Sequence, residues 1–227
     1  MKQAGIIGGT SWHSTEDLYR YVNSCVAERL GGNNCARLAV INVNMQDILD
    51  ADGPDGKGAI LARAARAAEA AGSDFVVICS NGLHEYAPYV IGAVDIPFVH
   101  IADSTATAIL SCGLKKVGFM AVKATIERDF YLKRLRSHGL EVLVPGPAEL
   151  EYMDNVLFNE VCMGVIKTES QQRFYEIAES LADKGAEGVI LGCTEIGELM
   201  QQEHTRLRLF DTTQIHAQAI AELCMSD

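Results

Sequence analysis

The sequence predicts an α/β protein made of two similar halves, each a parallel four-stranded sheet flanked by helices. Short apolar runs, typical of buried parallel strands, alternate with helix-like segments along the 227 residues. One such run, residues 76–81, is echoed by residues 189–195, and each ends in small polar and sulfur-containing residues. Corresponding segments lie about 110 residues apart, a period far longer than that of solenoid repeats. Together these observations indicate a duplicated βα domain.

Four strands and two long helices are expected in the first half. The strands are the apolar runs at residues 4–8, 36–43, 76–79 and 98–103. Residues 14–30 are expected to be an amphipathic helix because Leu18 and Val22 begin an apolar stripe at helical spacing. Residues 59–71, rich in Ala, Leu and Arg, favour a second helix. Residues 44–58 are polar and carry a proline and three glycines, so they are expected to form a mobile loop over a cleft.

The second half repeats this pattern. Its strands are expected at residues 116–122, 141–144, 189–191 and 209–211. Its helices are expected at residues 126–138, 154–165 and 170–182. An Ala-rich, helix-like run follows the closing strand of each half, at residues 106–110 and 215–223. The expected domains are residues 1–100 with 210–227, and residues 101–209.

The composition argues against several classes of function. A net charge of −11 disfavours nucleic acid or an anionic membrane as a partner. The seven cysteines are odd in number and lack tight pairing, which favours a reducing cytoplasm over a disulfide framework. No signal peptide is recognised, and no run reaches the roughly 18 apolar residues of a membrane span, so a cytoplasmic protein is expected. Neither a paired CxxC nor an HExxH motif is present, and no metal site is predicted.

The carboxyl ends of the predicted strands are where a ligand is expected in an open α/β sheet. Cys193 stands at such an end, where backbone N–H groups and a following helix would lower the pKa of its thiol. Cys193 followed by Thr194 is therefore interpreted as a general base beside an anion-binding site. The alternative, a core cysteine, fits the other unpaired cysteines better: Cys25, Cys35, Cys112, Cys162 and Cys224.

The matching strand end of the first half carries Ser80, with Cys79 before it and Asn81 after it. This end therefore offers a hydroxyl where the second half offers a thiol. His84 lies one helical turn after Ser80 and could line the same pocket. The alternative for His84 is a helix-start residue with a satisfied hydrogen bond.

Five motifs keep their order from end to end of the chain. They are GGTSWHST at residues 8–15 with Tyr19 and Arg20, CSN at 79–81, TIERDFY at 125–131, GCTEIG at 192–197 and DTTQIHA at 211–217. With these motifs the chain resembles the pyridoxal-phosphate-independent aspartate/glutamate racemase family, in particular its bacterial amino-acid racemase branch. The resemblance implies two flavodoxin-like domains related by pseudo-twofold symmetry, a homodimer and no cofactor. It also implies two-base proton transfer, in which one group removes the α-proton and another protonates the opposite face.

The sequence departs from the family's pattern at the first catalytic position. Ser80 stands where the family has its first cysteine, and Gly82 stands where a threonine usually follows the asparagine. A serine hydroxyl is a weaker base than a thiol, but it can donate or relay a proton through water. Cys79 is the alternative partner, although strand alternation points it away from the face that Ser80 occupies. Ser80 could also simply cap the following helix.

We therefore predict Cys193 as the principal base and Ser80 as the group on the opposite face. The residues that the resemblance implies for the α-carboxylate and ammonium of the substrate are Thr10, Asn81, Gly82, Thr125 and Thr194. By alignment, Asp52 and Tyr152 stand where relatives that act on acidic amino acids hold the side-chain carboxylate. Asp52 would repel a second carboxylate, unless it is a solvated loop acid.

The predicted function is a cofactor-independent amino-acid racemase or epimerase with a small amino acid as substrate. One alternative is a single-thiol carbon–carbon lyase resembling the arylmalonate decarboxylases, in which one cysteine protonates a carbanion. Another is a catalytically degenerate protein that binds an amino acid without turnover. The GCTEIG motif at residues 192–197 favours the racemase.

Overall fold

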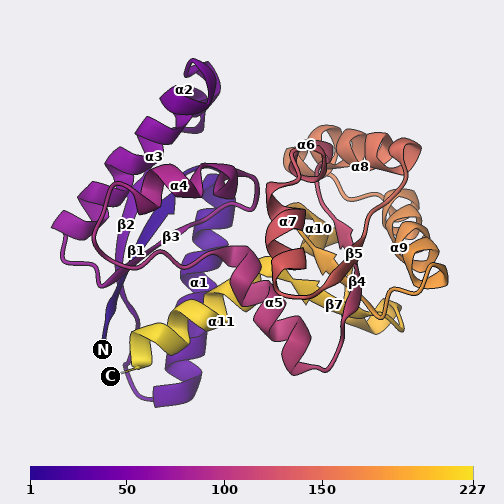
Figure 1. The fold of residues 1–227 in the computed structure, drawn as a ribbon. Coiled ribbons are helices and arrows are strands. Elements are labelled where there is room, and N and C mark those ends of the chain that lie inside the picture. Colours follow the sequence, from indigo (N-terminus) through magenta and orange to yellow (C-terminus); the bar gives the residue numbers. More distant parts are fainter. Residues whose placement is uncertain (227) are drawn as a thin grey trace. The chain divides into compact units, whose positions relative to one another are not determined.

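The computed structural model describes residues 1–226, which divide into two compact units. Unit 1 comprises Met1–Ser104 together with residues 213–226, and unit 2 comprises Thr105–Thr212. Each unit is built on its own parallel sheet with helices packed against it (Figure 1). The predicted α/β architecture of two helix-flanked parallel sheets is therefore confirmed. Within the described residues, no helix is both long enough and apolar enough to cross a membrane.

The sheet of unit 1 has the strand order β2-β1-β3. Its strands are β1 (Gln3–Gly8), β2 (Arg37–Asn42) and β3 (Phe75–Ile78), and both pairings are parallel. The helices are α1 (Trp12–Leu30), α2 (Met45–Asp50), α3 (Gly53–Ala70), α4 (Ala87–Ile91), the start of α5 (Ile101–Ser111) and α11 (Thr212–Met225), with a short 3-10 helix, η1 (Gly82–Tyr86). The unit boundaries fall within α5 and in the first turn of α11.

Side chains of β1 enter two different cores because successive residues of a strand point to opposite faces of the sheet. Ala4 and Ile6 pack with α1 and α11, whereas Ile7 packs with α3. The backbone N–H of Lys2 donates to the Cys224 carbonyl at 2.8 Å, which brings the start of β1 beside the end of α11 (Figure 1). Unit 1 is therefore completed by a helix that follows unit 2 in the sequence.

The prediction of four strands for the sheet of unit 1 is wrong. This sheet has three strands, because residues 98–103 do not form a fourth. Phe98 makes only an isolated parallel bridge with Val76. The preceding Pro97 has no N–H to donate to a ladder. The His100 ring accepts a hydrogen bond from the N–H of Ala102 at 3.1 Å, and α5 begins at once. The chain thus turns into a helix before further pairing can occur.

The prediction of a mobile loop at residues 44–58 is also wrong, because this segment is mostly helical. The Asn44 side chain accepts a hydrogen bond from the Gln46 N–H and starts α2. Pro54 occupies the first turn of α3, where the missing N–H has no partner to lose and the fixed φ suits a helix. The glycines and proline that suggest a loop therefore mark a helix start.

The sheet of unit 2 has the order β5-β4-β6-β7, which repeats the order of unit 1 with one more strand. Its strands are β4 (Lys116–Met120), β5 (Glu141–Leu143), β6 (Gly188–Leu191) and β7 (Arg208–Asp211), all parallel. This is the start of a flavodoxin-like order. Its further helices are α6 (Lys123–Glu127), α7 (Phe130–Ser137), α8 (Pro147–Asn159), α9 (Thr168–Asp183) and α10 (Thr194–Leu199), with 3-10 turns η2 (Val161–Met163) and η3 (Gln202–His204).

Two helices of unit 2 differ from the prediction. Residues 126–138 form two helices because Asp129 between them has a left-handed backbone, with φ of 58°. The helix expected from residue 154 begins earlier, at Pro147. There the Glu149 carboxylate accepts a hydrogen bond from the Gly146 N–H at 2.7 Å, which fixes the first turn.

Candidate active site

The end of β6 carries a glycine that packs directly on an aromatic ring. A Cβ at Gly192 would overlap the Phe119 ring of β4 and would lie 3.0 Å from the Ala121 Cβ. Phe119 in turn stacks on Tyr131 of α7, with ring centroids 4.8 Å apart. Only glycine therefore allows the end of β6 to close against β4, and Cys193 follows directly.

Cys193 is the N-cap residue of α10, and its thiol makes a hydrogen bond to a carboxylate. The Cys193 Sγ donates a hydrogen bond to Glu195 Oε2 at 2.8 Å. The Thr194 hydroxyl donates to the same oxygen at 2.7 Å. All three residues are partly exposed. The strand end thus presents a thiol, a hydroxyl and a carboxylate in one hydrogen-bonded group.

The pKa of the Cys193 thiol is raised well above its ordinary value, so the predicted lowering is wrong. The largest cause is burial among protein atoms, followed by the negative charge of Glu195 and the hydrogen bond to it. A backbone hydrogen bond lowers the pKa but is outweighed. The following helix, α10, has only six residues, so its dipole gives little help to a thiolate. Cys193 therefore holds its proton at neutral pH.

In unit 1, the ends of β1 and β3 are joined by a side chain. The Thr10 hydroxyl donates to the Cys79 carbonyl at 3.0 Å. Ser80 comes next and is partly exposed, and its Oγ accepts a hydrogen bond from the Leu83 N–H at 3.4 Å. Asn81, buried, and Gly82 follow at the start of η1. Thr10, Ser80, Asn81 and Gly82 thus lie at one edge of this sheet, and Ser80 caps a turn as its alternative interpretation proposed.

Cys79 is turned into the core of unit 1. Its Sγ donates to the Ser14 carbonyl of α1 at 3.1 Å, and its side chain is 6% exposed. Burial raises the pKa of this thiol to about 12, although the Thr15 hydroxyl acts in the opposite direction. A thiol so placed serves packing. The geometry therefore favours Ser80 over Cys79 as the group that a substrate can meet.

The remaining predicted residues lie on helices. Thr125 is buried on α6, which follows β4, the strand beside β6. Asp52 is exposed at the N-cap of α3, and its side chain makes no capping hydrogen bond. Tyr152 of α8 packs against the apolar core of unit 2. Thr125 is thus close in topology to Cys193, whereas the positions of Asp52 and Tyr152 within their units do not place them at a strand end.

The sequence model of the Asp/Glu/hydantoin racemase family matches residues 7–220, nearly the whole chain. The chain belongs to this family. Two related solved structures match over the full length of both chains. One is a Yersinia pestis protein assigned as an Asp/Glu racemase, 34% identical with a TM-score of 0.94. The other is an aspartate racemase homologue from Pyrococcus horikoshii OT3, 33% identical with a TM-score of 0.92.

A more distant structure shares the fold of this racemase-family chain. The aspartate racemase of Picrophilus torridus is 17% identical and has a TM-score of 0.77, with 99% of this chain and 94% of its own covered. Membership of the family supports a racemase or epimerase activity, which is an isomerase reaction.

Sequence reasoning misses two features of this family member. One is Glu195 as the hydrogen-bond partner of Cys193, for which the only signal is its place two residues later in the GCTEIG motif. The other is a buried histidine cluster of unit 1, whose third member, His216, lies in the DTTQIHA motif.

The histidine cluster consists of His84, His100 and His216, and it contacts the backbone of Ser80 through His84. The ring centroids of His84 and His100 are 4.4 Å apart, and those of His84 and His216 are 6.2 Å apart. His84 Nδ1 lies 2.6 Å from the Ser80 carbonyl, and His84 Nε2 accepts from the Ile101 N–H at 3.2 Å. His84 is thus a buried residue with satisfied hydrogen bonds, as the alternative to a pocket-lining role proposed. Among residues 1–226 no group of three or more His, Cys, Asp or Glu side chains could hold a metal ion.

Acid is expected to destabilise unit 1 through His216. Burial, and then the neighbouring His84, lower the pKa of His216 from 6.5 to about 3. The His216 ring binds a proton more readily in the unfolded chain than in the folded one. The stability that neutral His216 contributes to the folded state is therefore complete above about pH 6.5 and is lost as the pH falls toward 3. The loss is on the order of a few kcal/mol. Urea unfolding across this window should show a flatter pH dependence for His216→Leu than for wild type. His13→Gln, at an exposed histidine, should keep the wild-type slope, and a parallel slope for His216→Leu would contradict this account.

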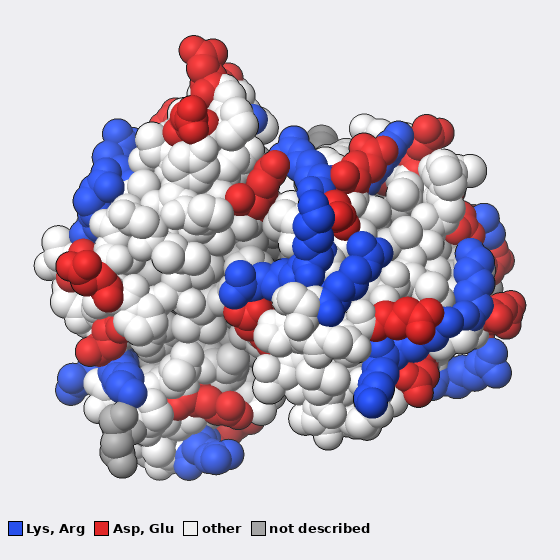
Figure 2. All heavy atoms as spheres, viewed as in Figure 1, with Lys and Arg blue, Asp and Glu red and all other residues white. Residues whose placement is uncertain are grey.

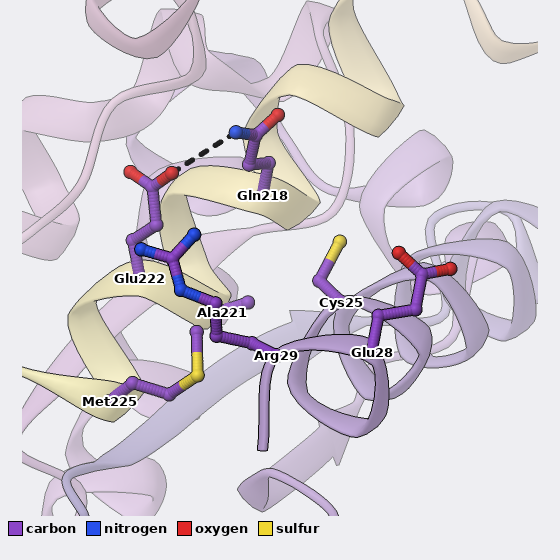
Figure 3. Close-up of a pocket in the computed structure, with 7 residues that line it drawn as sticks. All are labelled: Cys25, Glu28, Arg29, Gln218, Ala221, Glu222 and Met225. Atoms are coloured by element: carbon purple, nitrogen blue, oxygen red, sulfur yellow. Dashed lines mark hydrogen bonds between the residues drawn. The ribbon is translucent and has the colours of Figure 1, made fainter. Parts of the chain in front are cut away.

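A separate pocket of about 300 Å³ lies between α1 and α11 of unit 1 (Figure 3). Its lining consists of Cys25, Glu28, Arg29, Gln218, Ala221, Glu222 and Met225. Burial and the two nearby acids raise the pKa of the Cys25 thiol, which therefore stays protonated. The lining contains no predicted site residue, so this pocket is distinct from the strand-end groups.

Proposed function

We propose that this protein is a cofactor-independent amino-acid racemase or epimerase. Cys193 and Ser80 act on opposite faces of one α-carbon in this proposal. The observation that carries it is the hydrogen bond from the Cys193 thiol to Glu195, an ionisable thiol with a proton acceptor at a strand end of a racemase-family chain. The groups proposed to bind the α-carboxylate and ammonium are Thr10, Asn81, Gly82, Thr125 and Thr194.

The proposed reaction moves one proton off the α-carbon and another onto it. The Cys193 thiol first gives up its own proton, and the thiolate then takes the α-proton, while the electron pair of the C–H bond remains on carbon and the adjacent carboxylate. Hydrogen-bond donors around that carboxylate stabilise the growing negative charge. Ser80, directly or through a water molecule, delivers a proton to the opposite face, which inverts the centre, and regains a proton from solvent. Because a hydroxyl is the weaker acid–base group, the two directions should differ in rate.

The protonated state of Cys193 favours a second candidate, a single-thiol carbon–carbon lyase. A thiol whose pKa is raised is suited to deliver its proton to a carbanion. Such a carbanion forms when a substituted malonate loses one carboxylate as carbon dioxide. The hydroxyls and backbone N–H groups near Ser80 would then hold the remaining carboxylate.

Incubation with single enantiomers in deuterium oxide tests the proposal. A racemase replaces the α-proton by deuterium and inverts the centre, which NMR and chiral chromatography detect. A lyase instead releases carbon dioxide from a substituted malonate. Binding of amino acids with neither reaction would show a degenerate binding protein and overturn the racemase proposal.

Replacing Ser80 with cysteine should raise activity mainly toward the slower enantiomer. The substitution gives the weaker face a thiol, and a gain on the order of 10-fold or more is expected for the enantiomer whose α-proton points at that face. Initial rates of exchange for each enantiomer measure it. Ser80→Ala should slow the same enantiomer further. If Ser80→Cys accelerates neither enantiomer, or if Cys79→Ala is as damaging as Cys193→Ala, Ser80 is not the partner.

A neutral polar or basic amino acid is expected to be a better substrate than aspartate or glutamate. Asp52 is exposed and is near in sequence to three other exposed acids, Asp47 and Asp50 of α2 and Asp55 of α3. Figure 2 shows acidic side chains gathered at the α2 end of unit 1. A substrate carboxylate about 4 Å from Asp52 would meet a repulsion of roughly 1 kcal/mol, which approaches a tenfold loss of affinity. A panel of L-amino acids scored by deuterium incorporation measures the preference. Asp52→Asn should narrow the gap and Asp50→Asn should not; if aspartate or glutamate leads the panel, Asp52 does not face the substrate.

A further inference from the structure

Two aromatic rings support the end of β6 from the face opposite to the Cys193 thiol. A Cβ added at Gly192 would overlap the Phe119 ring, and Phe119 stacks on Tyr131 with ring centroids 4.8 Å apart and ring planes 18° apart. Because successive residues of a strand point to opposite faces, Gly192 faces these rings and Cys193 faces away from them. The Cys193 side chain accordingly packs against the core cluster that contains Leu191. The rings can therefore affect the thiol only through the backbone.

The ring pair is fully buried, which makes it a firm support. Phe119 and Tyr131 are both 0% exposed. Buried side chains pack at high density in fixed rotamers, and stacked rings prefer a defined separation. The Gly192 N–H donates to the Met120 carbonyl of β4 at 2.7 Å. The backbone before Cys193 is thus held by a ring contact on one face of the sheet and by a hydrogen bond to the neighbouring strand.

The turn before α7 directs Tyr131 into this position. Asp129 has a φ of 58°, and among residues 1–226 it is the one non-glycine residue with a positive φ. Its carboxylate pairs with Lys133 at 3.5 Å and with Arg136 at 3.2 Å, which ties the turn to the helix that follows. Such a backbone persists where the surrounding structure fixes it, and it is typical of functional sites. The TIERDFY motif therefore carries a second feature besides Thr125, the placement of the Tyr131 ring.

We propose that Tyr131, acting through Phe119 and Gly192, is a positioning residue for the Cys193 thiol. Its role in turnover rests on the proposed function. Proton transfer requires reacting atoms about 3 to 3.5 Å apart and aligned, and a misplacement of about 1 Å can lower a rate on the order of 100-fold. The ring stack sets the backbone position at residue 192, and this position fixes where the thiol stands relative to an α-carbon.

Tyr131→Leu tests the proposal because it removes the ring on which Phe119 stacks and leaves the thiol itself unchanged. The kcat for α-proton exchange should fall on the order of 10- to 100-fold, because the base is misplaced. KM should change by less than about threefold, because the substrate-binding groups are retained. Without substrate, iodoacetamide should alkylate Cys193 on the order of 10-fold faster, since a loosened strand end lets the enclosed thiol meet the reagent. Peptide mapping by mass spectrometry identifies the alkylated cysteine.

Two control variants separate positioning from general packing. Leu135→Ala shortens another fully buried side chain of α7, one helical turn after Tyr131 and outside the ring stack. It should lower the urea midpoint of unfolding but leave kcat and the alkylation of Cys193 near their wild-type values. Tyr131→Phe keeps the stacked ring and should retain most of the exchange activity, which would assign the effect to the ring and not to the hydroxyl.

Gly192→Ala disturbs the same contact from the side of the strand. Its Cβ would overlap the Phe119 ring, so the strand end should be displaced and kcat should fall on the order of 10-fold. When Gly192→Ala is combined with Tyr131→Leu, Phe119 gains room to move aside. The double variant should therefore lose less activity than the product of the two single losses. If circular dichroism shows that Tyr131→Leu is unfolded, Phe119→Leu takes its place in this cycle.

The outcomes separate this inference from the function on which it rests. An unchanged alkylation rate of Cys193 in Tyr131→Leu, or losses that simply multiply in the double variant, would overturn the positioning role. Leu135→Ala would also overturn it by changing kcat and alkylation as much as Tyr131→Leu does. If the wild-type protein exchanges no amino acid, the racemase proposal fails, whereas faster alkylation in Tyr131→Leu would still establish the link between this ring and the thiol.

Discussion

Replacing Cys193 with alanine is expected to abolish measurable α-proton exchange and inversion. The thiol is the proposed base at the strand end of unit 2, and general acid–base groups contribute on the order of 10²- to 10⁴-fold to a rate. Within the described residues, the hydrogen bonds of its side chain involve only its near neighbour Glu195, so the fold should survive the change. Exchange in deuterium oxide measures the activity, and circular dichroism checks the fold.

Cys112→Ala is the matched control for Cys193→Ala. Cys112 is a partly exposed cysteine of the same unit, and its removal should leave exchange near the wild-type rate. Cys193→Ser should keep at most a trace of activity, because a hydroxyl is a far weaker base. Full activity in Cys193→Ala would remove Cys193 from the mechanism altogether.

Replacing Gly9 with alanine is expected to destabilise unit 1 by about 2 to 5 kcal/mol. Gly9 has a φ of 86°, in the left-handed region that disfavours a side chain. A Cβ there would also overlap the Val43 carbonyl oxygen and lie 2.7 Å from Asn42 Oδ1. The Gly9 N–H donates to Thr15 Oγ1 at 2.9 Å, so the turn cannot move aside without losing a hydrogen bond. Urea unfolding measures the change.

Gly72→Ala separates the two causes. Gly72 has a similar φ of 82° in the same unit, but nothing lies within 4 Å of the Cβ it would gain. Its substitution should cost only about 1 kcal/mol, the backbone share of the effect. Equal losses of unfolding free energy for Gly9→Ala and Gly72→Ala would show that the overlap with the Val43 carbonyl does not contribute to the effect at Gly9.

The sequence predicts strands better than it predicts the segments between them. The runs around Ile6 and Val189 are recognisable because a strand buried on both faces requires continuous apolar residues. The prediction of a fourth strand in unit 1 is wrong because residues 98–101, apolar except for His100, can equally begin a helix. The choice depends on the His100 cap. The break between α6 and α7 at Asp129 is not predicted for a similar reason. A single residue with a left-handed backbone does not change the spacing of the apolar residues around it.

The position of the candidate site is predictable, but its electrostatics are not. Cys193 can be found because it ends an apolar strand and matches a motif. The direction of its pKa shift depends on how deeply the sulfur is enclosed and on the rotamer of Glu195, and neither is encoded in spacing. The pairing of His84 with the Ser80 carbonyl likewise requires a local backbone path that a pattern does not reveal.

The placement of α11 has a consequence for the order in which the protein can fold during synthesis. Unit 2 is one continuous segment and can complete its core as soon as residue 212 has left the ribosome. The core that Ala4 and Ile6 line in unit 1 also requires Ala217, Ile220 and Cys224 of α11. The unit 1 residues that precede unit 2 in the chain must therefore wait, with part of their apolar surface uncovered, until α11 emerges. The earliest strands of this chain belong to the unit that is finished last.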